Sequence, residues 1–276
     1  MAAPTYNDIY KFSRTLQHIS QEARSEFQKL LSEVDFSDWS IAANQLRTLI
    51  QGIVSRYGLA SAEIGAQWYE YCRKMNFDSR YTAIVGEVSR YSVSSDVNAE
   101  IDKLFNGEVN EAELVSLLSG AVVDQVQKQA RDTILSNLNA EYLDAIARGD
   151  KSFASKCGYA RVTTGDSCAF CIMLASRGFV YASERTATKS KRGDKYHNHC
   201  HCVAVPFAKA DSINGYEKTL YKHKQMYHDA DNLRRSGNYP DELRERIDAA
   251  KANHSGRWDA LNEIMIIMRY QTEGLS

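Results

Sequence analysis

The chain has 276 residues, of which 43% are hydrophobic and 25% charged, a composition typical of a globular protein with one or two domains. Its formal net charge is −1, so no overall field draws it to nucleic acid or to an anionic membrane, and any DNA contact has to be local. The first residues do not resemble a secretion signal, and no apolar run approaches the roughly 18–20 residues of a membrane span. We therefore expect a protein without membrane contact, made in a reducing cytosol.

The first third of the chain is predicted to be helical. Thr5 and Asp8 resemble a capping box, and apolar residues follow at steps of three or four from Ile9 to Val34. Similar stripes predict a second helix from Trp39 to near Gly58 and a third over residues 59–75.

The next stretch is predicted to be helical as well, with one less regular part. Residues 82–105 are expected to form a helix interrupted by the polar run SVSSD. Asn110 is a candidate cap for a long helix, or for two helices, that ends at Gly149-Asp150. The apolar stripes of all these helices are expected to pack into the core.

The pattern changes after residue 150. Residues 157–210 contain short β-prone runs bounded by Gly, Asp and Pro, with a short helix between them that ends at Gly178. From residue 211 the chain reads as helical again, and Pro240 suits the first turn of a helix. We expect a mainly α protein with a helical domain (1–150), a small zinc-stapled α+β module (151–210) and a helical C-terminal region (211–276).

The cysteines are concentrated in one part of the chain. Four of the six lie within one window of 35 residues, at Cys168, Cys171, Cys200 and Cys202. A disulfide framework would spread along the chain of a secreted protein, so this clustering favours metal or redox chemistry. Cys72 falls on a predicted helix and is expected to be a buried apolar residue.

The spacing of the clustered residues predicts a structural zinc site. Cys168-x-x-Cys171 supplies two thiolates from one turn, and a second turn with the pattern His-x-x-Cys-x-Cys can complete a tetrahedron. The candidate ligands are Cys168, Cys171, His197, Cys200 and Cys202. The last two ligands are open among His197, Cys200 and Cys202, and His199 and His201 lie beside them.

The sequence gives less support to a redox, nuclease or other catalytic site in this stretch. A redox pair at Cys168 and Cys171 lacks the preceding βαβ pattern. The letters HNH at 197–199 are no nuclease evidence, because that motif spreads its residues over a ββα unit. No pattern marks Asp166, Glu184 or Asp194 as catalytic, so no catalytic residue and no enzyme activity are predicted.

Two further groups of residues are candidates for a functional role: a basic segment within the module and the histidines outside it. Residues 185–195 form a basic segment that is either a solvated insertion or a local contact for phosphates or an acidic partner. Outside the module, the histidines are expected on polar helix surfaces, at His18, His223, His228 and His254.

The order of residues in 160–207 resembles the Cys/His module of MuF-like phage minor head proteins, in the form found in tailed phages of actinobacteria. The resemblance rests on Ala-Arg, Cys-Ala-Phe-Cys, Leu-Ala-Ser-Arg-Gly, a following Tyr, and His-x-x-Cys-x-Cys before Val-Pro-Phe. It covers the motif positions Cys168, Cys171, Arg177, Gly178, His197, Cys200 and Cys202.

This resemblance implies a minor capsid protein of the virion, placed inside the head near the portal. Such a protein would assist head morphogenesis and DNA packaging or delivery, and its partners would be the portal and other capsid proteins. Phage DNA is a further candidate partner through the basic segment 185–195. The alternatives are a zinc-dependent nuclease or toxin-like hydrolase, and a zinc-ribbon protein that binds nucleic acid.

Overall fold

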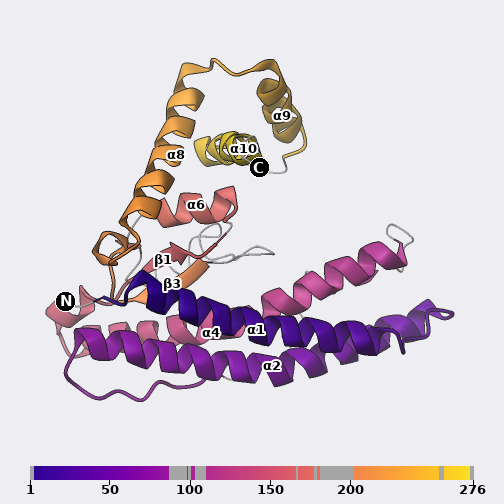
Figure 1. Ribbon diagram of the computed structural model, residues 1–276, viewed down its shortest axis with the longest axis horizontal. Coiled ribbons are helices and arrows are strands. Elements are labelled where there is room, and N and C mark those ends of the chain that lie inside the picture. Colours follow the sequence, from indigo (N-terminus) through magenta and orange to yellow (C-terminus); the bar gives the residue numbers. More distant parts are fainter. Residues whose placement is uncertain are drawn as a thin grey trace.

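A computed structural model describes residues 3–86, 98, 101–102, 110–165, 167–176, 179–180, 202–254 and 258–273. Over these residues the protein is mainly helical and contains one small antiparallel sheet, as predicted (Figure 1). None of the helices in the described ranges is long and apolar enough to cross a membrane.

Three long helices lie side by side and form the base of the molecule (Figure 1). They are α1 (Tyr6–Leu31), α2 (Trp39–Asn76) and α4 (Glu111–Ala147). The predicted capping box is confirmed: Thr5 Oγ1 accepts from the Asp8 N–H, and the Asp8 carboxylate accepts from the Thr5 N–H. Asn110 caps α4, also as predicted.

The predicted break near Gly58 is wrong, because α2 runs unbroken through it. Gly58 and Gly65 are both buried in α2. A Cβ built on Gly65 would lie 2.6 Å from the backbone oxygen of Ala130 on α4. Gly65 therefore allows close contact between α2 and α4, and Gly58 does not end the helix.

The segment after α2 also differs from the prediction. Residues 81–86 form neither helix nor strand, whereas residue 98 and residues 101–102 are helical; the remainder of the predicted 82–105 helix lies outside the described residues. Asn137 on α4 holds this segment, since its side-chain amide bonds both the N–H and the carbonyl oxygen of Ile84, each at 2.8 Å. Tyr81 donates its hydroxyl to the same Asn137 oxygen.

The sheet lies between the three-helix base and the short helix α6 (Ala169–Ser176) (Figure 1). Its order is β2-β1-β3, with β1 (Tyr159–Thr163), β2 (Phe179–Val180) and β3 (Cys202–Pro206) all antiparallel. The one-turn helix α5 (Lys151–Ala154) precedes it. Every residue of β1 and β3 is buried, because helices cover both faces of the sheet.

The C-terminal region is helical as predicted. A short 3-10 turn, η1 (Ala210–Ser212), leads to α8 (Glu217–Ser236), α9 (Asp241–Ala252) and α10 (Ala260–Glu273). Gly237, with φ of 67°, ends α8 in the left-handed conformation. Pro240 is the N-cap of α9, one position earlier than expected.

The predicted module contributes residues to two separate hydrophobic cores. The main core joins β1 and β3 to α1, α2 and α4. The C-terminal core joins α6 to α8, α9 and α10, with Met173, Ile247, Ile264 and Met268 among its buried residues. The strands and the helix of the module thus pack in different cores, and the boundaries at 150 and 210 stay predictions.

The base contains one buried ion pair. Arg73 Nε lies 2.9 Å from both carboxylate oxygens of Glu141, and the Tyr69 hydroxyl donates to the same carboxylate at 2.6 Å. The guanidinium of Arg73 also lies over the rings of Phe77 and Tyr81. The pair therefore ties α2, α4 and the segment after α2 together.

His223 is not on the surface, which corrects the prediction for that histidine. It is 6% exposed, and its Nδ1 lies 3.4 Å from the hydroxyl of Tyr216. Tyr216 in turn contacts the backbone N–H and the hydroxyl of Thr163 at the end of β1. Burial, with a smaller contribution from Lys222, lowers the pKa of His223 to about 4.

Candidate metal centre

The first cysteine turn is built on the start of α6. The carbonyl oxygen of Cys168 accepts from the Ile172 N–H at 3.0 Å, which places Cys168 at the cap position of the helix. The backbone N–H of Cys171 donates to Cys168 Sγ at 3.4 Å. Such an N–H bond stabilises the thiolate form that binds metals. Cys168 is exposed, whereas Cys171 is buried.

The second turn contributes Cys202, the first residue of β3. Cys171 and Cys202 are 1% and 5% exposed, respectively, and pack against each other as a small buried group of their own. Cys202 is paired in register with Thr163 on β1. The fold therefore brings together two thiols separated by 31 positions in sequence, with Cys168 one helical turn away.

The other candidate ligands, His197 and Cys200, lie outside the described residues, as do His199 and His201. The same holds for Arg177, Gly178, the basic segment 185–195 and the acids Asp166, Glu184 and Asp194. In the part of the chain that is described, no group of three or more His, Cys, Asp or Glu side chains is placed to hold a metal ion. The complete ligand set therefore stays a prediction.

The remaining described cysteines have a different character. Cys72 is buried in the main core, as predicted, and burial raises the pKa of its thiol well above the ordinary value. Burial also raises the pKa of Cys157 to about 12. Both thiols stay protonated near neutral pH, which makes them structural residues and not metal ligands.

The three described candidate ligands, Cys168, Cys171 and Cys202, have the chemistry that zinc requires. Zinc in structural sites prefers Cys thiolates and His nitrogens, and all three cysteines are free of disulfides. The pair Cys171–Cys202 lies at a junction, because α6 belongs to the C-terminal core and β3 to the main core. A metal held by these residues would join the two cores.

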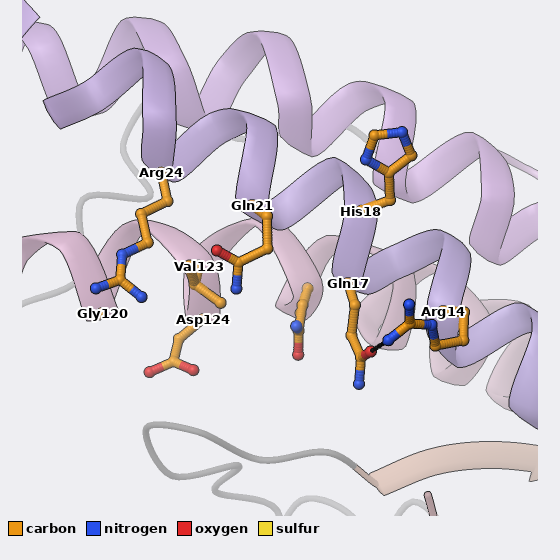
Figure 2. A pocket seen from close by; sticks show the side chains of 9 residues that line it. Arg14, Gln17, His18, Gln21, Arg24, Gly120, Val123 and Asp124 are labelled. Atoms are coloured by element: carbon orange, nitrogen blue, oxygen red, sulfur yellow. Dashed lines mark hydrogen bonds between the residues drawn. The ribbon is translucent and has the colours of Figure 1, made fainter. Parts of the chain in front are cut away.

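A polar groove between α1 and α4 was not predicted from the sequence (Figure 2). We call it the α1–α4 groove. Its volume is about 490 Å³, and its lining residues are Arg14, Gln17, His18, Gln21, Arg24, Gly120, Val123, Asp124 and Gln127. A second helical stripe on α1 could have revealed it, since polar residues recur at 14, 17, 21 and 24 beside the apolar stripe.

These observations define a class: a helical protein whose cysteine-bearing sheet and short helix lie between a long-helix base and a C-terminal helical region. A family model described as VG15 protein matches residues 3–230. That range is most of the chain, so the chain belongs to the VG15 family, which makes it a phage protein. No curated protein and no solved structure matches the chain.

Proposed function

We propose that the chain is a MuF-like minor capsid protein, a structural component inside the phage head near the portal. It would assist head morphogenesis and DNA packaging or delivery. Membership of a phage family supports this proposal, as does the order of residues in 160–207, which resembles the Cys/His module of minor head proteins.

The observation that carries the proposal furthest is the contact between Cys171 and Cys202. We propose a structural zinc ion held by Cys168, Cys171 and two of His197, Cys200 and Cys202. When bound, zinc would supply a cross-link between α6 and β3. Modules with little core of their own rely on such metals, because the binding free energy adds to the stability of the fold.

The proposed role is not enzymatic. Four protein ligands around zinc leave no open position for water or substrate, which catalysis at zinc requires. The portal and other capsid proteins are the proposed partners. Phage DNA is a further proposed partner, through the basic segment 185–195.

The location can be tested on purified phage particles by quantitative mass spectrometry. We expect a few copies of the chain per particle, protected from protease added to intact particles and degraded once the heads are opened. The major capsid protein and an external tail protein serve as controls for the two compartments. Absence from the particles, or degradation in intact heads, would contradict the proposal.

A further inference from the structure

The α1–α4 groove presents two guanidinium groups for which the described residues supply no paired carboxylate. Arg47, Arg56 and Arg148 each form an ion pair with an acid. By contrast, no carboxylate of the described chain lies within ion-pair distance of Arg14 or Arg24. An arginine without a carboxylate partner has planar N–H donors whose geometry matches a carboxylate or a phosphate.

The two arginines stand at the ends of one line of polar side chains. Arg14, Gln17, Gln21 and Arg24 follow each other at steps of three or four, so they share one face of α1. Ten residues of helix correspond to about 15 Å along the axis. Figure 2 shows these four side chains extending into the hollow, and Arg14 donates a hydrogen bond to the side-chain oxygen of Gln17 at 3.5 Å. A ligand would meet a cation at each end and two amides between them.

The lining favours a polypeptide over a nucleic acid. A glutamine amide both donates and accepts, as a peptide backbone does, whereas a phosphodiester only accepts. Asp124 lies on the α4 side of the hollow, and a strand carrying one charge per about 3.4 Å would place phosphates against it. None of the described lining residues is Phe, Tyr or Trp, the side chains on which bases most often stack.

The distance between Arg14 and Arg24 along α1 further favours a ligand with an extended backbone. Residues i and i+4 of a strand lie on the same face and about 13 Å apart, which long arginine side chains can span. The backbone groups of an extended segment are also open to Gln17 and Gln21, whereas those of a helix are already bonded.

We propose that the α1–α4 groove binds an extended acidic segment of a partner protein. Two carboxylates four residues apart would pair with Arg14 and Arg24, and the backbone between them would bond Gln17 and Gln21. The groove is lined by residues other than the candidate metal ligands, and the proposal goes beyond the proposed structural role because it names the chemistry of a partner.

The test uses the full chain and a fluorescein-labelled peptide, Gly-Glu-Thr-Val-Thr-Glu-Gly, whose binding is followed by fluorescence anisotropy. We expect the double variant Arg14→Gln/Arg24→Gln to bind at least about tenfold more weakly, since each charge-assisted pair contributes on the order of 1 kcal/mol or more. Replacing both glutamates of the peptide with glutamine should weaken binding to the unaltered chain by a similar factor.

The matched control is Arg80→Gln/Arg269→Gln, which removes two exposed arginines outside the groove. It should bind the peptide as the unaltered chain does, and circular dichroism should show that both double variants are folded. The proposal is overturned if the unaltered chain does not bind the peptide, or if the groove variant binds it as well as the unaltered chain does. It is also overturned if the groove variant binds the peptide normally and loses only its binding to a labelled single-stranded oligonucleotide. The last result would assign the groove to nucleic acid.

Discussion

At the scale of single residues, His223 links acidity to stability. Its pKa is about 4 in the folded chain because the ring is buried, whereas an unfolded chain has the ordinary value near 6.5. Between these values the unfolded state binds more protons. The stability is therefore fully present above about pH 6.5 and is lost as the pH falls toward 4.

Replacing His223 with glutamine should remove this acid sensitivity. We expect the free energy of unfolding of the unaltered chain to fall by about 1–3 kcal/mol more than that of the variant between pH 7 and pH 4.5. Urea unfolding at both values measures the difference. His18→Gln, at an exposed histidine, is the matched control and should keep the sensitivity. An equal pH dependence in the His223 variant would contradict the role of burial.

The buried pair Arg73–Glu141 should contribute far more than a surface pair. Its side chains are 8% and 10% exposed, so Glu141→Gln leaves a guanidinium buried without its counter-charge. We expect a loss of about 3 kcal/mol in the free energy of unfolding. Glu242→Gln weakens the exposed pair with Arg246 and should cost less than about 1 kcal/mol. Similar losses for both variants in urea unfolding would show that burial of the pair adds nothing.

At the scale of elements, two glycines of α2 offer a matched comparison. A Cβ on Gly65 would meet the backbone of Ala130 at 2.6 Å, whereas a Cβ on Gly52 would meet nothing within 4 Å. Gly52→Ala should therefore stabilise the protein by about 0.5–1 kcal/mol, the ordinary helix propensity difference. Gly65→Ala should destabilise it by about 1–3 kcal/mol, because α2 and α4 must move apart. Thermal unfolding that ranks the two variants in the opposite order would contradict this packing.

Local sequence signals predicted the ends of several helices. They failed where contacts between distant parts of the chain determine whether a segment is helical. Capping residues such as Thr5 and Asn110 act within one turn, so the sequence shows them directly. Gly58 carries the local signal of a helix end, yet packing against neighbouring helices keeps α2 continuous. The non-helical segment 81–86 is held by Asn137, more than 50 positions away, and no local pattern could show this contact.

At the scale of the whole molecule, the sequence predicts which thiols share a site, but it could not show which parts of the fold that site would connect. The spacing of Cys168, Cys171 and Cys202 pointed to a shared site, and the structure places the last two in contact. That this contact joins two cores follows only from the packing of α6 and β3. The burial of His223 depends in the same way on long-range packing, here against Tyr216 and the end of β1.

The proposed zinc cross-link also predicts an order of unfolding. In the double variant Cys168→Ser/Cys171→Ser, residues 157–207 of the module should unfold first, while the long-helix base keeps its structure. Hydrogen exchange should show increased exchange in α6 and β3 before α1 and α2. Uniform exchange across all these elements would mean that the cysteines do not hold the module.

The most direct test of the central claim is the zinc content of the purified chain, measured by elemental analysis. We predict about one zinc per chain for the unaltered protein, in line with a four-ligand structural site. Cys72→Ala should keep that zinc, because Cys72 is a core residue, whereas Cys168→Ser/Cys171→Ser should lose it. A zinc-free unaltered chain, or the same zinc content in the double variant, would contradict the account.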